Sequence, residues 1–437
     1  MIKTIKYREI LFVYALLILV LSLMIQNYSN TPLLSIAALP VIISVAVSAL
    51  KNQNWLFVCF YALCAEVYYI MLLCIYVIKG TETSWRFLYA HEAYNAVSLR
   101  LALMSMLILS LVYIFMLFHT RLPENEILTK NSISGVQAVL FLVIYTVIIF
   151  YYGIKTPSMG MRLYTSNQNI MILSLFRVCC LIGWVVLPGF KGIYKRILTA
   201  ESAVAVIIIA LLSINGYRFL LFENVIMIIV LNLSKIRKIR MKTWIMLAFM
   251  AVIFYIALTV LKSKYTGRAT DSIMFNHEKN LFYSLNALIA NMGSERMNTY
   301  LSTIKNLLPK AITGSTDLNT GGMLMKYIGY EMYLQSNVTM GGYYLTEAYA
   351  NMHESGIYIV SLFFAVVFSA IEKRRAEKPA SPLFMCIYYG LISQTYNFVY
   401  YGSSNYVKFL VYYIIFAMVI LFPLRKTESA RRHDSQK

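Results

Sequence analysis

Long apolar runs with few charged residues recur along most of the chain, and short polar segments separate them. A helix that crosses a bilayer needs about 20 predominantly apolar residues, and by that measure about twelve runs are candidate spans. They cover residues 10–26, 33–50, 55–78, 99–118, 136–154, 170–188, 201–214, 219–234, 243–261, 355–371, 382–398 and 406–424. The pattern predicts an all-α polytopic membrane protein with about 12 transmembrane helices.

The connection that covers residues 262–354 is far longer than any other. Its segments YSLNALIANM and RMNTYLSTIKNLL carry apolar residues at helical spacing, so we expect helices that lie on the membrane surface or cap a cavity. A Pro/Gly/Ser/Thr-rich stretch follows and predicts a loop. The chain then divides into a first set of helices at 1–261, the large loop at 262–354, a second set at 355–424 and a basic tail at 425–437.

Composition and charge agree with a membrane protein. Hydrophobic residues make up 59% of the chain and charged residues 13%, whereas a soluble domain has about 45–50% and about 25%. The formal net charge is +20, and its basic clusters are FKGIYKR, KIRKIRMK, EKRRAEK and RKTESARR. Placing these clusters inside predicts that both termini are cytoplasmic (N-in/C-in) and that the long loop is outside. Much of the charge is then a topological signal, and nucleic-acid binding is not needed to explain it.

Motifs for soluble nucleotide and metal chemistry are missing from the sequence. It has no GxGxxG, Walker A, Gly-x-Ser-x-Gly or zinc-protease pattern. Its six cysteines lie inside apolar runs, and none pairs with a histidine at a zinc-binding spacing. We therefore expect no cofactor, no metal site and no soluble nucleotide-binding domain.

The stretch GGYYLTEAYANMHESG at 341–356 concentrates polar residues just before an apolar run. If it is helical, one face carries Tyr343, Glu347, Asn351 and Glu354. A neighbouring face carries Thr346, Tyr349 and His353. Two carboxylates stacked two turns apart could supply a general base and a partner that holds substrate hydroxyls. The alternative interpretation is a solvated helix entry with capping residues.

Several arginines lie on the predicted outer side, where the charge bias disfavours them. Arg218 follows the tight turn Ile214–Tyr217, and its planar fork suits phosphate or diphosphate. Snorkelling to lipid headgroups explains the same position equally well. The others in outer connections are Arg86, Arg162, Arg268 and Arg296. Together they suggest an anionic ligand on that side.

Ionisable residues also occur inside candidate spans, where they are costly and often functional. These are Glu66, Arg177 and Glu223. Glu223 lies about a turn and a half inward from Arg218 and could belong to the same site. Arg177 and Glu66 could instead pair with each other.

The layout resembles that of the Wzy-type polymerases of O-antigen and capsular polysaccharide. The segments NGYRF at 215–219, ERMNTYLSTIKNLLPKAI at 295–312 and GGYYLTEAYANMHESG at 341–356 are similar to family patterns. These patterns are Gly-x-Arg at the outer end of a central helix, a helix ending in proline, and Glu-Ala-Tyr-x-Asn between glycines. Many members read Phe-Gly after the asparagine, whereas this chain has Met352 and His353.

The resemblance implies a fold like the GT-C glycosyltransferases and a polymerase at the outer face of the bacterial cytoplasmic (inner) membrane. Its substrates would be undecaprenyl-diphosphate-linked oligosaccharides, and a flippase and a chain-length regulator would be partners. Arg218, with Arg86, Arg162 or Arg268, would hold diphosphates. Glu347, Glu354 or His353 would activate or orient the acceptor hydroxyl. Tyr343, Tyr349 and Asn351 would contact sugars.

Three other functions stay open on sequence alone. An O-antigen ligase would use the same lipid donor but would transfer glycan to lipid A-core. A polysaccharide flippase or transporter would need a polar path through the bilayer, and the few charges inside the spans disfavour it. A membrane acyltransferase would need a histidine or nucleophile site, for which His91, His277 and His353 are the outer histidines.

Overall fold

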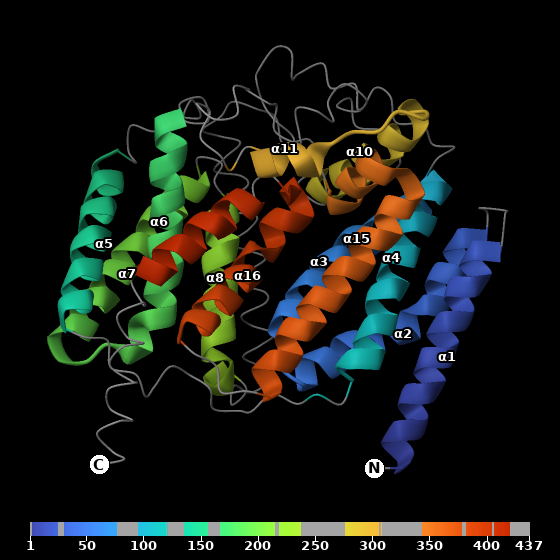
Figure 1. The fold of residues 1–437 in the computed structure, drawn as a ribbon, viewed down its shortest axis with the longest axis horizontal. Helices are drawn as coiled ribbons and strands as arrows, with labels where there is room; N and C mark the ends of the chain where they lie inside the picture. The colour runs from blue at the N-terminus through green and yellow to red at the C-terminus, as the bar shows by residue number, and fades with distance from the viewer. Residues whose placement is uncertain are drawn as a thin grey trace. The chain divides into compact units, whose positions relative to one another are not determined.

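The computed structural model describes residues 2–24, 30–76, 95–118, 120, 135–155, 167–214, 218–236, 276–305, 307, 343–377, 382–403 and 406–419. All regular structure in these residues is helical (Figure 1). The helices are α1 (Ile2–Met24), α2 (Thr31–Lys51), α3 (Trp55–Tyr76), α4 (Asn95–Met116), α5 (Gly135–Lys155), α6 (Asn167–Val186), η5 (Leu187–Gly189), α7 (Gly192–Ile214), α8 (Arg218–Ile236), α10 (Asn276–Asn291), α11 (Thr299–Lys305), α15 (Tyr344–Glu377) and α16 (Pro382–Tyr401). A further apolar helix covers Tyr406–Val419. The all-α prediction is confirmed for the described residues.

Five helices in the described part of the chain are long and apolar enough to cross a membrane. They are Tyr7–Met24, Thr31–Lys51, Asn95–Met116, Gly192–Ser213 and Tyr344–Glu377. Large apolar side chains also point away from the protein, such as Ile10, Leu33 and Phe150, as expected for a chain embedded in lipid. The total of about twelve spans and their orientation stay predictions, and the candidate span at 243–261 lies outside the described residues.

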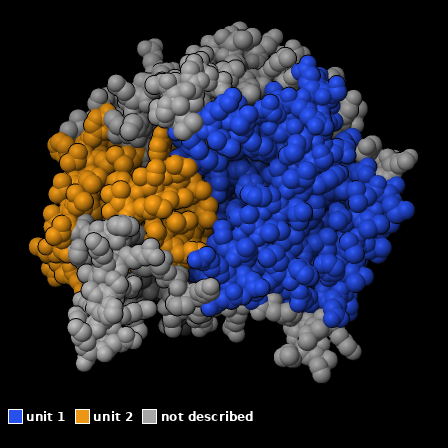
Figure 2. All heavy atoms as spheres, in the orientation of Figure 1, with its two compact units in different colours: residues 1–122, 274–378, 395–408 blue, residues 123–273, 379–394, 409–437 orange. Residues whose placement is uncertain are grey.

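Contacts divide the chain into two compact units, each assembled from segments far apart in sequence (Figure 2). Unit 1 comprises residues 1–122, 274–378 and 395–408. Unit 2 comprises residues 123–273, 379–394 and 409–437. Helix α16 contributes its first part to unit 2 and its last part to unit 1.

In unit 1, α15 packs along α4, and α10 packs against α3, α4 and α15. Aromatic side chains fill the centre, where the Phe60 ring centroid lies 5.4 Å from that of Tyr344 and 5.1 Å from that of Phe368. Polar side chains fix α10: Ser284 Oγ lies 2.9 Å from Thr346 Oγ1, and the Asn286 amide donates to Asn95 Oδ1. Helix α10 is therefore docked onto other helices, and the two predicted placements, on the membrane surface or over a cavity, stay predictions.

The start of α3 shows how a distant residue supports a helix. Its first turn has backbone N–H groups without partners inside the helix. The Glu372 side chain of α15 is fully buried, and its Oε1 accepts from Leu56 N at 2.7 Å and Phe57 N at 3.4 Å. A carboxylate also suits the positive end of the helix dipole. Glu372 thus caps α3 from another helix.

In unit 2, α5 packs on α7, and α8 packs on both α6 and α7. Helix α7 begins at Gly192 rather than near residue 201, so the predicted start of this span is wrong. Residues 192–200 read GIYKRILTA, in which cations interrupt an otherwise apolar pattern. Long Lys and Arg side chains can reach a polar boundary while their backbone continues a helix. Lys195 and Arg196 of the basic cluster therefore lie within the first turns of α7, and Lys191 precedes it.

Candidate functional site

Glu347 lies at the start of α15 and is fully buried in unit 1. Its Oε1 accepts hydrogen bonds from the hydroxyls of Thr299 (3.0 Å) and Ser403. Its Oε2 accepts from the backbone N–H of Ser403 at 2.6 Å. One carboxylate therefore joins three segments: α11, α15 and the turn after α16. This placement replaces the alternative of a solvated helix entry, because a buried carboxylate with fixed donors is part of the packing.

Asn351 reinforces the same junction one turn later. Its Oδ1 accepts from Thr299 N at 3.0 Å, and its Nδ2 donates to Thr299 Oγ1 at 2.6 Å. The amide also donates to the carbonyl of Glu347 at 2.7 Å, so these two residues share a face as their spacing predicted. We call Glu347, Asn351, Thr299 and Ser403 the Glu347 clamp.

Helix α11 is oriented by this clamp. Thr299 and Thr303 are buried, and Thr303 Oγ1 lies 2.9 Å from Ser403 Oγ. Leu301 and Ile304 are instead exposed. Burial and the nearby charge of Glu347 raise the pKa of Tyr300, so its phenol stays neutral near pH 7. The polar face of α11 therefore faces the protein, and its apolar face points outward.

The regular helix is interrupted at Met352 and His353, which corrects the assumption of one continuous face through Glu354. Met352 has φ −143° and ψ 17°, and His353 has φ 54° and ψ −143°. The positive φ of His353 is a conformation that glycine favours. A Cβ on Gly356 would lie 2.1 Å from the Ala348 carbonyl oxygen. The break therefore brings two turns of backbone together and requires glycine at 356.

The other candidates in this stretch differ in accessibility. Glu354 is exposed, and His353 is half-buried with its ring 5.3 Å from that of Tyr349 in an edge-on contact. Tyr343 is buried and packs against the ring of Tyr344 at 5.1 Å. His353, Glu354, Tyr349 and Asn351 are thus at least partly accessible, whereas Tyr343 and Glu347 belong to the interior.

The arginine candidates are mostly beyond what the structure describes. Arg218 is the first residue of α8, but its side chain is outside the described set. Arg86, Arg162 and Arg268 also lie outside the described residues. Arg296 is exposed in the segment before α11. Their role in binding diphosphate stays a prediction.

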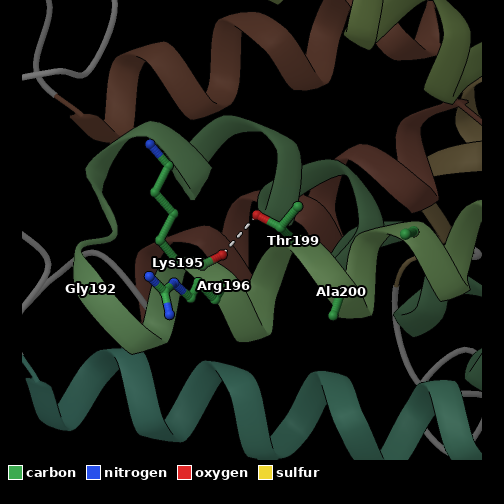
Figure 3. Close-up of a pocket in the computed structure, with 6 residues that line it drawn as sticks. Gly192, Lys195, Arg196, Thr199 and Ala200 are labelled. Atoms are coloured by element: carbon green, nitrogen blue, oxygen red, sulfur yellow. Dashed lines mark hydrogen bonds between the residues drawn. The ribbon is translucent and has the colours of Figure 1, made fainter.

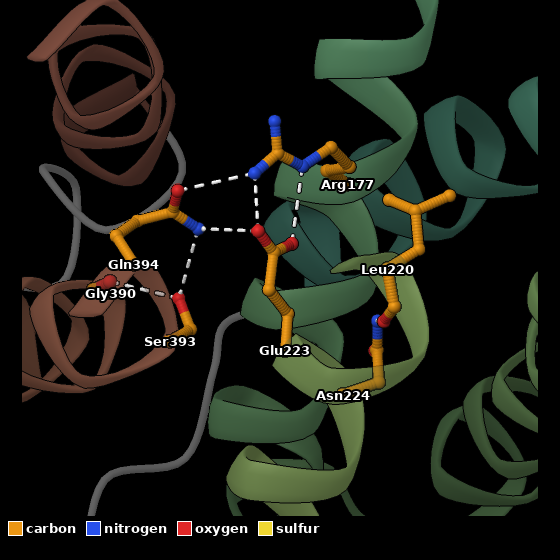
Figure 4. Close-up of polar contacts among 7 residues, drawn as sticks. All are labelled: Arg177, Leu220, Glu223, Asn224, Gly390, Ser393 and Gln394. Atoms are coloured by element: carbon orange, nitrogen blue, oxygen red, sulfur yellow. Dashed lines mark hydrogen bonds and ion pairs between the residues drawn. The ribbon is translucent and has the colours of Figure 1, made fainter. Parts of the chain in front are cut away.

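Arg177 of α6 pairs with Glu223 of α8 in unit 2, and not with Glu66 as one alternative held (Figure 4). Arg177 Nε donates to Glu223 Oε2 at 3.1 Å, and Nη2 donates to Oε1 of the same carboxylate. Gln394 of α16 joins both, accepting from Arg177 at 3.1 Å and donating to Glu223 at 3.2 Å. Glu66, in unit 1, accepts from the Tyr400 hydroxyl at 3.2 Å.

The ion pair between Arg177 and Glu223 is largely buried within unit 2. Glu223 is fully buried, and the Arg177 side chain is 11% exposed. The guanidinium also lies 3.9 Å from the ring centroid of Phe409. A bidentate contact and an aromatic face both suit arginine more than lysine.

A shallow hollow of about 680 Å³ runs along α7 (Figure 3). It is lined by Gly192, Lys195, Arg196, Thr199, Ala200 and Ala203. Lys195 and Arg196 are exposed, and both belong to the basic cluster that charge patterning placed inside. None of the predicted catalytic or sugar-contact residues lines it.

Glu201 is an ionisable residue that the sequence interpretation missed. The apolar pattern predicts that Glu201 lies at the edge of a span at 201–214, whereas α7 begins at Gly192 and places Glu201 well inside the candidate span Gly192–Ser213. The signal that could have found it is the continued apolar spacing of Ile193, Ile197 and Leu198 upstream.

Within the described residues, no group of three or more His, Cys, Asp or Glu side chains is arranged to hold a metal ion. Comparison with models of protein families, with curated proteins and with solved structures finds no match to the chain. Function must therefore be argued from the residues themselves.

Proposed function

We propose that the protein is a membrane glycosyltransferase that polymerises lipid-diphosphate-linked oligosaccharide repeats into O-antigen or capsular polysaccharide. In each cycle the bond between the sugar anomeric carbon and the diphosphate oxygen of the growing chain breaks. A new glycosidic bond forms to a hydroxyl at the non-reducing end of the next unit. The hydroxyl proton passes to a base, and undecaprenyl diphosphate leaves. The donor bond supplies the free energy, so no nucleotide is needed.

The observation that carries the proposal is the Glu347 clamp followed at once by the helix break. The clamp fixes the polar stretch rigidly against α11 and the end of α16. The break then leaves His353 and Glu354 accessible at the end of that rigid segment. A reacting group held by packed neighbours is what precise positioning of an acceptor requires.

This geometry suggests distinct roles for the candidate residues. Glu347 and Asn351 position the segment, because their polar atoms are already used inside the protein. His353 or Glu354 would take the acceptor proton, and Tyr349 would contact sugar. Arg218, with Arg86, Arg162 or Arg268, would stabilise the diphosphate leaving group, as arginine forks suit phosphate oxygens.

The proposal includes a cellular setting. The enzyme would act at the outer face of a bacterial cytoplasmic membrane, where lipid-linked units arrive from a flippase. A chain-length regulator would be a second partner, and no nucleic acid or cofactor would take part. The basic connections support the orientation that this setting needs.

The test compares surface polysaccharide from a deletion strain with that from strains carrying His353→Ala, Glu354→Gln or Arg218→Ala. Glu377→Gln is the matched control, because it alters an exposed carboxylate at the other end of α15. The amount of each protein in the membrane is measured alongside. We expect single repeat units on lipid A-core in the deletion strain, in Arg218→Ala, and in at least one of the two α15 variants, with a normal polymer ladder in the control.

Other outcomes identify the rivals. Polymer that forms but stays on undecaprenyl diphosphate in the deletion strain would identify a ligase. Single lipid-linked units retained on the inner leaflet would identify a flippase or transporter. Normal polymer in the deletion strain would exclude both polymerase and ligase and would direct attention to acyl groups on the surface sugars.

A further inference from the structure

Glu201 lies on the outward face of α7, among side chains that suit lipid. On the same face, four residues before and three after it, Ile197 is 41% exposed and Val204 is 45% exposed. On the facing helix α5, Val143 and Phe150 flank Thr146 in the same way and are 55% and 69% exposed. The carboxyl group therefore lies within the candidate span Gly192–Ser213 beside an apolar surface.

The two oxygens of this carboxyl group differ in their contacts. Thr146 Oγ1 donates a hydrogen bond to Glu201 Oε1. Glu201 Oε2 is buried and has no hydrogen-bond partner within the described structure. The hydroxyl of Tyr145, next in sequence to Thr146, is buried and interacts with Ser202 and Cys180 instead of Glu201. A buried polar atom without a partner is rare in proteins, so Glu201 Oε2 indicates a site.

Among the described residues, the charged and titratable groups around Glu201 offer it no cation at that level of the bilayer. Helix α5 contributes the phenol of Tyr145. Helix α6 contributes the thiols of Cys179 and Cys180, of which Cys179 interacts electrostatically with Glu201. The nearest titratable side chain described on α8 is Glu223, which Arg177 already holds. Lys195 and Arg196 lie on α7 more than a turn earlier and are exposed. An ionised carboxylate here would lose its hydration and gain only a hydroxyl partner.

We propose that Glu201 and Thr146 form a proton-binding site within the bilayer, in which Glu201 Oε2 carries the proton. Thr146 fixes Oε1 as an acceptor and leaves Oε2 for the proton. The hollow along α7 is lined by residues from Gly192 to Ala203, and neither Glu201 nor Thr146 is among them. This site is separate from the transfer reaction proposed above, so either proposal can fail alone.

The experiment labels the full-length protein in lipid nanodiscs with dicyclohexylcarbodiimide. This membrane-soluble reagent adds to a protonated carboxyl group and, after an oxygen-to-nitrogen acyl shift, leaves a stable N-acylurea. Peptide mass mapping at several pH values locates the adduct. Glu223 is the internal control, because it is buried but paired with a cation. A water-soluble carbodiimide and the variants Glu201→Gln and Thr146→Val complete the set.

We expect an adduct on Glu201 at pH 7 that is severalfold larger than any on Glu223, whose carboxylate is paired with Arg177. It should fade as pH rises, should disappear in Glu201→Gln, and should persist in Thr146→Val. The water-soluble reagent should label Glu201 weakly. If Glu201 stays unlabelled in nanodiscs, an infrared difference spectrum against Glu201→Gln decides. A protonated carboxyl band for Glu201 supports the site, and a carboxylate band at pH 7 overturns it. A cation that a second copy of the chain places beside Glu201 would also overturn it.

Discussion

Asn351 holds Thr299 through two hydrogen bonds, one from the Thr299 backbone to Oδ1 at 3.0 Å and one from Nδ2 to the Thr299 hydroxyl at 2.6 Å. These two bonds use both the oxygen and the nitrogen of the Asn351 side-chain amide, and they hold the start of α11 against α15. Glu347, one turn earlier in α15, accepts a hydrogen bond from the Thr299 hydroxyl at the same junction. The spacing of Glu and Asn by four residues is therefore explained by a shared structural task.

Replacing Asn351 by Ala should detach the start of α11. The change leaves the Thr299 N–H without its acceptor, and an unpaired buried polar group costs about 1–3 kcal/mol. We expect a lower melting temperature of the purified protein in detergent and faster proteolysis near residue 299. Thr199→Ala is the control, because that exposed hydroxyl bonds only its own helix. Equal melting temperatures for the two variants would contradict the clamp.

Glu347 should tolerate glutamine better than leucine. A glutamine can direct its oxygen to the Ser403 N–H while the two hydroxyls rotate to accept from its amide, so the cost should be about 1–2 kcal/mol. Leucine leaves the donors of Thr299 and Ser403 unpaired and should cost about 2–5 kcal/mol. Melting temperatures of the two variants check the order.

The same pair of variants separates positioning from chemistry. If Glu347 only positions the segment, Glu347→Gln at normal abundance should retain most polymer formation. A complete loss of polymer in a stable Glu347→Gln protein would instead show that its carboxylate takes part in the reaction.

The protein should be more stable with glycine at position 353 than with alanine there. Both changes remove the imidazole and its contact with Tyr349, but only glycine lacks the Cβ that makes φ 54° unfavourable. We expect His353→Gly to exceed His353→Ala in stability by about 1 kcal/mol, measured as a higher melting temperature. If the imidazole serves the reaction, both variants lose polymer equally, so stability and activity separate. A less stable glycine variant would show that the break at 353 is not as the structure has it.

Much of the fold was readable from sequence, because apolar runs and helical spacing report local physics. The helices at α10 and α11 follow from their periodicity, and the shared face of Glu347 and Asn351 follows from their four-residue spacing. The break at His353 was not readable, because it depends on the approach of Ala348 to Gly356. The partner of Arg177 depends on which helices pack together, which periodicity does not specify.

Breaking the buried ion pair between Arg177 and Glu223 in unit 2 should strongly destabilise the protein. Glu223→Gln leaves the Arg177 guanidinium buried without its counter-charge, and such losses cost about 3–5 kcal/mol. Arg177→Gln should cost a similar amount, because it leaves the Glu223 carboxylate alone. The double variant removes both charges and should be more stable than the sum of the single losses predicts, with a coupling of about 1–3 kcal/mol. Melting temperatures of the four proteins in one detergent complete the cycle. Additive losses would mean that Arg177 and Glu223 do not stabilise each other and that Gln394 and Phe409 hold the arginine by themselves.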